Sequence, residues 1–173
     1  MYPKEYLEYL VHFHGDRDYF ECHEILEDHW KKTDFGNKES IWVGLILLAV
    51  SAYHHRRNNF NGAKRTLKKA MNIFKVQEEL LTKLGLDGAK LHSFLIERLS
   101  MIEGGKAYTS FNLPVNDPEL LDLCIKGCEQ EGLIWGNASN MADAEIVHRH
   151  KLRDRTDVTA ERNKALAKKK GSI

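Results

Sequence analysis

The longest apolar run of the chain, from Ile41 to Tyr53, is interrupted only by Gly44 and Ser51. It is shorter than the ~20 residues that a helix needs to span a bilayer. A helix that is apolar on all sides is typical of the middle of a globular core. We therefore predict a buried central helix over about Glu39 to Arg57, surrounded by other helices, and no association with a membrane.

Helical periodicity continues through most of the chain, which has only three prolines and shows no sustained alternation typical of a sheet. Asp18, Asp87 and Asp117 stand where N-caps are expected, and Pro118 follows the last of them at the first helical position. The sequence predicts an all-α fold, a single-domain bundle of about six helices with a polar C-terminal extension. The expected helices are about Tyr2–His14, Asp18–Thr33, Glu39–Arg57, a fourth that runs from a tight link at 58–62 to Leu84, Asp87–Glu103 and Asp117–Glu131.

Charge divides the chain into two parts. Residues 1–144 hold 17 Lys and Arg against 21 Asp and Glu, whereas residues 145–173 hold 9 against 4. With 173 residues, the chain is long enough for one compact domain and a tail. We predict a helical domain over residues 1–131, and a basic extension over 132–173 that is helical or partly disordered. Such an extension could contact a nucleic-acid backbone, and the body permits a homodimer or an unknown protein partner.

The three cysteines are Cys22, Cys124 and Cys128, an odd and sparse set that is a poor framework for disulfides. Cys124 and Cys128 also lack the spacing of redox and zinc motifs, so reduced thiols are the simplest interpretation. The N-terminal sequence has no basic region followed by an apolar core, which is the pattern of a secretory signal. These observations predict a cytoplasmic protein.

Chemistry is suggested by polar residues on the second predicted helix. On a helical wheel, Tyr19, Cys22, Leu26 and Trp30 form an apolar stripe, His23 falls inside it, and Glu27 also points inward. Glu24 lies at the edge of the stripe. Burying ionisable groups without partners costs several kcal/mol, so these residues require compensation. His23 and Glu27 stand at i and i+4 and can compensate each other.

Two interpretations of this group follow from the residues. In the first it is a structural core network, in which His23, Glu24 and Glu27 are joined by other polar or aromatic side chains: Trp30, Tyr53, His54 and Asn59. In the second, His23, Glu27 and His54 form a set of two nitrogens and one oxygen that could hold a divalent metal. A di-iron centre is disfavoured because no second inward set of Glu and His residues is found. No cofactor is expected under the first interpretation.

A third interpretation is nucleolytic. Arg17 and His23 are separated by five residues, which is similar to the short Arg–His signature of HEPN-type ribonucleases. In that role, His23 would be the acid–base group and Arg17 would hold a phosphate, with the pair lining a cleft at a dimer interface. The catalytic candidates are therefore His23, Glu27 and Arg17.

The segment from Asp18 to Trp30, DYFECHEILEDHW, resembles the hallmark of the bacterial family of domain of unknown function 309. A second part of the pattern runs from Gly44 to His54 and continues through Asn59 and Gly62, so that the resemblance covers about residues 15–75. It implies a small all-α fold and a cytoplasmic protein of a Bacillus-like bacterium, and it brings no established reaction. The pattern often carries Gln at the position of Leu47. If that Gln bonds to the His–Glu group in the family, this chain has lost one partner, which counts against a fixed catalytic constellation.

The sequence thus leaves two functional hypotheses, and whether the chain is an enzyme stays open. The first is a non-catalytic interaction or scaffold domain with a buried His–Glu network. The alternative is a metal-dependent hydrolase-like enzyme or a HEPN-like ribonuclease centred on His23.

Overall fold

A computed structural model of the chain describes residues 1–141 and 143–148, which form helices and loops with no strand among them. The all-α prediction is confirmed. Leu86 and Val115 form an isolated antiparallel bridge between two loops. The helices are α1 (Lys4–His14), α2 (Tyr19–Thr33), α3 (Ile41–Arg56), α4 (Phe60–Val76), α5 (Glu78–Lys83), α6 (Gly88–Glu103), α7 (Pro118–Gln130) and α8 (Ala144–Val147).

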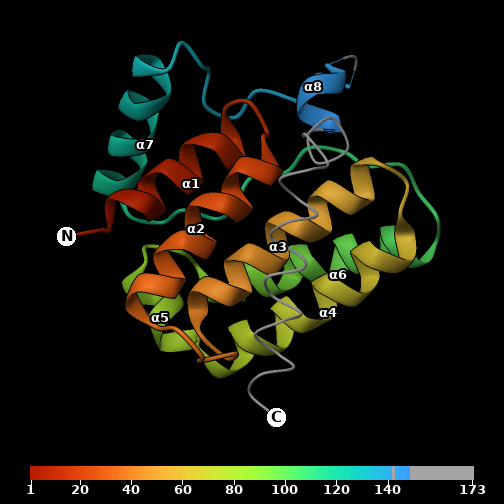
Figure 1. Ribbon diagram of the computed structural model, residues 1–173, viewed down its shortest axis with the longest axis horizontal. Helices are drawn as coiled ribbons and strands as arrows, with labels where there is room; N and C mark the ends of the chain where they lie inside the picture. Colours follow the sequence, from red (N-terminus) through yellow and green to blue (C-terminus); the bar gives the residue numbers. More distant parts are fainter. Residues whose placement is uncertain (142, 149–173) are drawn as a thin grey trace, which may run out of the picture.

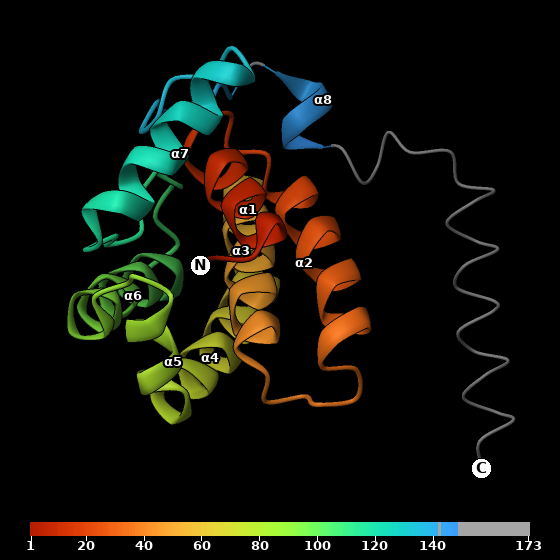
Figure 2. The same cartoon turned by 90° about the vertical axis from the view of Figure 1, so that its left-hand side faces the viewer.

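Helix α3 is the centre of the bundle, as its apolar run predicts. Eleven of its 16 residues are buried. Helices α2 and α4 pack against α3 from different sides, α1 packs on α2, and α6 packs on α4 (Figure 1; Figure 2). A Cβ atom on Gly44 would lie 2.8 Å from the Phe74 ring, so this glycine permits the close approach of α3 and α4.

Three predicted N-caps are confirmed. The Asp18 side chain accepts a hydrogen bond from the Glu21 amide at 3.2 Å, and the Asp87 side chain accepts one from the Lys90 amide at 3.1 Å. Asp117 accepts from the Glu119 amide at 3.0 Å, with Pro118 in the first turn. Each side chain satisfies a backbone N–H that has no partner inside its helix.

The predicted fourth helix is divided in the structure. Helix α4 ends at Val76, and α5 begins at Glu78. Gln77 leaves the helical conformation with φ −103° and ψ 32°, and its side-chain amide donates to the Glu39 carbonyl at 3.0 Å. Neither glycine nor proline marks this break, and Leu81 and Leu84 stay buried beyond it. The apolar periodicity therefore continues across a change of axis that it does not reveal.

The body of the protein continues past residue 131. Trp135 stacks on His14 with ring centroids 4.0 Å apart, and the Gly136 amide donates to the His14 carbonyl at 2.9 Å. Val147 in α8 is also buried. The predictions of a helical or partly disordered extension and of a basic binding segment fall mostly on residues 149–173, which lie outside the described residues.

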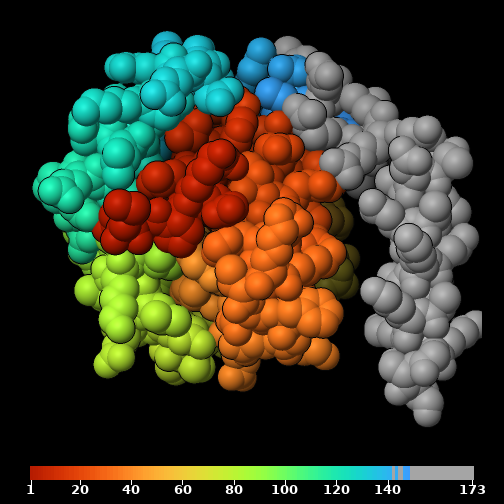
Figure 3. Space-filling view, turned by 60° about the vertical axis from the view of Figure 1, so that its left-hand side comes forward, coloured from red at the N-terminus to blue at the C-terminus, as the bar shows by residue number. Residues whose placement is uncertain are grey.

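Helix α1 lies at the surface between α2 and α7 (Figure 3). Its inner side is aromatic: Tyr6, Tyr9 and Phe13 are buried, and the Tyr9 hydroxyl donates to the Leu45 carbonyl of α3 at 2.8 Å. The turn between α1 and α2 lies beside the C-terminal end of α3. None of the helices described is long and apolar enough to cross a bilayer.

Candidate functional site

A row of three polar side chains follows the surface of α2. His23 Nε2 lies 2.7 Å from one Glu27 carboxylate oxygen, and Lys31 Nζ lies 2.9 Å from the other. The three residues are successive i, i+4 neighbours, so the helix itself sets this geometry. The hydrogen bond with His23 lowers the pKa of Glu27 to about 2, assisted by Lys31 and opposed by partial burial. We call His23, Glu27 and Lys31 the α2 row.

The predicted burial of this group is wrong. The side chains of His23 and Glu27 are 29% and 34% exposed. Only Tyr19, Cys22 and Leu26 are fully buried on α2. Among the helices that the structure describes, α2 packs mainly on α3 and α1. The apolar stripe that meets neighbours is therefore narrower than the wheel suggests, and the His–Glu pair lies at its edge.

The other members of the predicted network belong to a separate group. His54 Nδ1 lies 3.1 Å from the side-chain nitrogen of Asn59, and Asn59 caps α4 by accepting from the Gly62 amide at 3.1 Å. Burial, with Arg57 and Arg65 nearby, lowers the pKa of His54. His54 and Asn59 thus organise the connection from α3 to α4.

Aromatic rings lie between these two groups. The Phe20 ring lies 5.8 Å from the His23 ring and 6.1 Å from the Tyr53 ring. The buried Tyr53 ring in turn lies 6.1 Å from His54. The α2 row and the α3–α4 connection therefore meet through apolar contact of rings, which fixes helix positions.

Trp30 makes its contacts with the loop between α2 and α3. The Trp30 indole donates to the Asn37 carbonyl at 3.1 Å, and its ring packs 5.9 Å from Phe35. Trp30 therefore holds the loop between α2 and α3. Glu24 is half-buried on α2. Leu47, at the position of the family Gln, packs against the core.

The candidate metal ligands do not converge. Among residues 1–141 and 143–148, no three His, Cys, Asp or Glu side chains are grouped so that they could hold a metal ion. His23 and Glu27 pair with each other, whereas His54 faces Asn59. Two ligands on one helix do not complete the three- or four-ligand set that a catalytic metal requires.

Arg17 is only 1% exposed and has a left-handed backbone with φ 56°. Its Nε donates to the Asn137 carbonyl at 2.8 Å, and its Nη2 donates to the Asn112 side-chain oxygen at 2.7 Å. Its Nη1 donates to the Phe111 carbonyl. The predicted phosphate-holding role does not fit this position, because every guanidinium nitrogen is already committed to a loop of the same chain.

Sequence reasoning did not identify two further buried arginines, Arg56 and Arg98. Arg56 Nη1 donates to the Arg17 carbonyl at 2.7 Å and to the Ser139 hydroxyl at 3.0 Å. Its guanidinium carbon lies 4.7 Å from the centre of the Tyr19 ring. Burial lowers the pKa of Arg56, and its Nε is the one buried side-chain polar atom of the described residues without a hydrogen-bond partner. Arg56 therefore connects the α1–α2 turn, α3 and the segment near residue 139.

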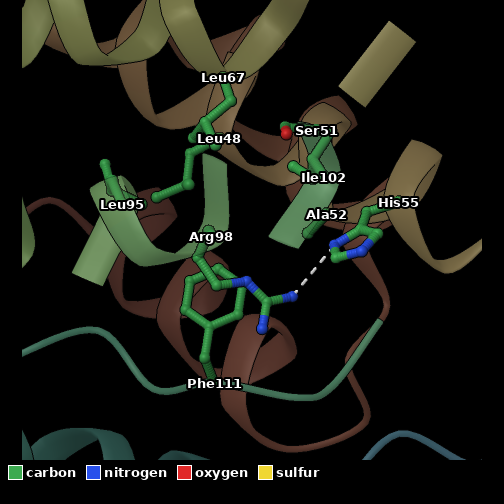
Figure 4. A pocket seen from close by; sticks show the side chains of 9 residues that line it. All are labelled: Leu48, Ser51, Ala52, His55, Leu67, Leu95, Arg98, Ile102 and Phe111. Atoms are coloured by element: carbon green, nitrogen blue, oxygen red, sulfur yellow. Dashed lines mark hydrogen bonds between the residues drawn. The ribbon is translucent and has the colours of Figure 1, made fainter. Parts of the chain in front are cut away.

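Arg98 is the third buried arginine near this junction. Its Nη2 lies 3.3 Å from His55 Nδ1 (Figure 4). Its Nη1 donates to the Thr109 hydroxyl at 3.0 Å. The guanidinium also covers the Phe111 ring at 4.3 Å. His55 Nε2 lies 2.8 Å from the Lys106 carbonyl, so this nitrogen carries the proton and Nδ1 accepts from Arg98. We call Arg17, Arg56 and Arg98 the arginine cluster.

The space beside Arg98 and His55 is small. The cavity in Figure 4 has a volume of about 10 Å³, and its other walls are mainly apolar side chains such as Leu48, Leu67 and Phe111. This is room for about one water molecule and not for an organic substrate. The burial of Arg98 could be predicted from the sequence, because it shares the helical spacing of the buried residues Leu91, Leu95 and Ile102. Its loop partners could not be predicted in this way.

A larger hollow of about 510 Å³ lies between α4, α5 and α6. Its floor includes the apolar residues Phe74, Leu81, Leu91 and Leu95, and Lys75, Glu78 and His92 also line it. Lys75, Glu78 and His92 come from three different helices and form no group of potential metal ligands. The hollow contains none of the residues that the sequence predicted for catalysis.

The comparisons with known proteins agree with the family resemblance seen in the sequence. The family model for a domain of unknown function (DUF309) matches residues 6–66. The chain is 42% identical over 172 residues to the uncharacterized protein YpuF of Bacillus subtilis (strain 168), covering 99% of each chain. No solved structure matches. The matched residues include both the α2 row and the α3–α4 connection.

Proposed function

Because the chain belongs to the family of domain of unknown function 309, no inherited reaction guides its assignment, and we propose that it is a non-catalytic interaction domain. Its His–Glu pair and its arginine cluster then serve the architecture that presents the outer helix surfaces to a partner. The proposal keeps the first functional hypothesis of the sequence and moves its polar pair from the core to the helix surface.

The burial and hydrogen bonding of Arg17 are the main support for this proposal. A phosphate-holding arginine must offer free N–H donors to its substrate. The Arg17 guanidinium is buried and donates to three loop oxygens, from Phe111, Asn112 and Asn137. Freeing it would leave those oxygens unsatisfied and expose a buried loop junction. These bonds support a bracing role and weigh against the ribonuclease alternative.

The pairing of the other candidates supports the same assignment. His23 forms its close contact with Glu27 on its own helix, and His54 is paired with Asn59. The 10 Å³ cavity beside His55 leaves no room for a substrate. Neither group supplies an acid–base residue, an orienting partner and a substrate space together.

An RNA integrity assay tests the proposal. Full-length protein is incubated with a short, labelled single-stranded RNA, with magnesium, with manganese and with a chelator. We expect intact RNA in every case, for wild type and for His23→Gln alike. RNA cleavage that disappears in His23→Gln, with the helical circular dichroism spectrum unchanged, would overturn the non-catalytic assignment. Light scattering on the same samples reports whether the protein is a homodimer.

A further inference from the structure

The segment between Glu39 and Glu78 carries positive charge only. Between Glu39 and Glu78 the sequence has no acidic residue but seven Lys and Arg residues. Arg56 is buried, and Arg57 closes α3 with its guanidinium 5.3 Å from the Tyr53 ring. The five other cations all lie on α4. Helix α4 therefore gathers five cations and no carboxylate in an otherwise mildly acidic body.

These α4 cations share one side of the helix. Lys64, Arg65, Lys68 and Lys69 follow i, i+4 spacing and form what we call the α4 basic row. Arg65, Lys68 and Lys69 are exposed and Lys64 is half-buried. The opposite side of α4, with Ala63, Leu67 and Ala70, is buried against α3 and α6 (Figure 1). The packing of the helix therefore holds four cations in a fixed arrangement at the surface.

No carboxylate of the described residues lies within ion-pair distance of this row. Some exposed lysines elsewhere have such partners one turn away on their own helix: Lys32 lies 3.0 Å from Asp28, and Lys126 lies 2.9 Å from Asp122. Helix α4 holds no Asp or Glu at any position, so the same compensation is unavailable. Arg65 also contributes to the lowered pKa of the neighbouring His54. The row thus offers uncompensated positive charge to an anionic partner.

The composition of the α4 surface favours one class of anion. Interfaces between proteins are enriched in aromatic residues and depleted in Lys. The exposed positions of α4 have the reverse composition: Asn61, Asn72 and Lys75 accompany the basic row, Val76 at the end of the helix is the one exposed apolar residue of α4, and no aromatic residue of α4 is exposed. From Lys64 to Lys75 the helix rises roughly 16 Å, which matches the rise of about five phosphates along one strand of a duplex.

We propose that the α4 basic row binds the phosphate backbone of a nucleic acid, mainly through charge and with little reading of base sequence. This inference rests on the proposed interaction function and names its partner class. It places the binding surface on α4, whereas the sequence suggested the basic C-terminal segment. Binding of this kind weakens steeply with salt, because each neutralised phosphate releases counterions.

Fluorescence anisotropy with full-length protein tests the proposal. The probes are a labelled DNA duplex and a labelled single-stranded RNA, both of mixed sequence, over about 50 to 200 mM NaCl. The test variant is Arg65→Gln/Lys68→Gln/Lys69→Gln, in which Gln keeps the helix propensity. The matched control is Lys83→Gln/Lys90→Gln/Lys126→Gln, which removes the same charge from exposed positions on α5, α6 and α7.

We expect the α4 variant to bind at least about tenfold more weakly at the lowest salt, with the slope of log K against log[salt] reduced by about 2. The control should stay close to wild type. The tighter of the two probes identifies whether duplex or single strand is the source of the phosphates. If the triple variant loses helicity, each single substitution should still lower the slope by about 0.7 to 0.9.

Several results would overturn the inference. One is the absence of binding to both probes, and another is an equal loss in the α4 variant and the control. A third is a loss confined to Lys168→Gln/Lys169→Gln/Lys170→Gln in the basic C-terminal segment. A fourth is tighter binding of labelled poly-L-glutamate than of either nucleic acid, which would indicate an acidic protein partner. None of these results bears on the non-catalytic assignment, which the RNA integrity assay judges separately.

Discussion

The α2 row and the arginine cluster are both polar, yet they connect the chain in different ways. His23, Glu27 and Lys31 are partners within one helix, four residues apart, and are partly exposed. Arg17 is buried and holds residues that lie 94 to 120 positions further along the chain. Exposed local pairs contribute little to stability, whereas a buried cation that satisfies several oxygens is costly to remove. The α2 row is therefore the less important of the two groups for the fold.

The largest effect should come from pH, through His14 beside the cluster. Burial lowers the pKa of His14 to about 3, while its Nδ1 contacts the Leu10 carbonyl at 2.7 Å and its Nε2 accepts from the Leu113 amide at 2.9 Å. The unfolded chain takes up a proton near pH 6.5 and the native chain does not, so stability is complete above that pH and falls below it. Urea unfolding between about pH 6.5 and 4 should show a loss of about 3 kcal/mol from this group.

His14→Gln should remove that part of the pH dependence and lower stability near neutral pH. The exposed His92→Gln is the matched control and should leave the curve unchanged. A wild-type curve that is flat over this range would contradict the buried, neutral state of His14.

A smaller effect is expected from Arg98. Arg98→Met retains an apolar, unbranched side chain but removes the donors to His55 and Thr109 and the guanidinium that covers the Phe111 ring. We expect the free energy of unfolding to fall by about 2 kcal/mol, measured by urea titration. Lys90→Met, an exposed position on the same helix, should cost far less. An equal loss of unfolding free energy in both variants would show that Arg98 contributes no more to stability than an exposed residue.

The smallest effect concerns the α2 row. A double-mutant cycle of His23→Gln and Glu27→Gln should give a coupling of about 0.5 kcal/mol, because both side chains are partly solvated. The lowered pKa of Glu27 means that its contribution is complete above about pH 4.5 and is lost as pH falls toward 2. The exposed pair Asp28 and Lys32 provides the reference cycle. A coupling above about 2 kcal/mol would show that the row behaves like a buried network.

The parts of this protein that sequence predicts are those set by local chemistry. The caps at Asp18, Asp87 and Asp117 and the central position of α3 follow from short patterns and apolar periodicity. The contact of His23 with Glu27 follows from helical spacing alone. The break at Gln77 is not predictable in this way, because the apolar face continues across it.

The site was predicted less well, because it depends on contacts between residues that lie far apart in the sequence. Arg17 looked available for a phosphate because its partners, Phe111, Asn112 and Asn137, lie in loops far along the chain. The α2 row looked buried because a wheel cannot show which sides of α2 are covered by its neighbours. Both errors have one physical origin, since burial depends on tertiary neighbours that local periodicity does not specify.

The most direct test of the central claim compares Arg17→Gln with His23→Gln by urea unfolding near neutral pH. The account predicts a loss of about 3 kcal/mol for Arg17→Gln, because its loop oxygens lose charged donors, and under 1 kcal/mol for His23→Gln. Unchanged stability in Arg17→Gln, or a loss in His23→Gln as large as that of Arg17→Gln, would contradict it.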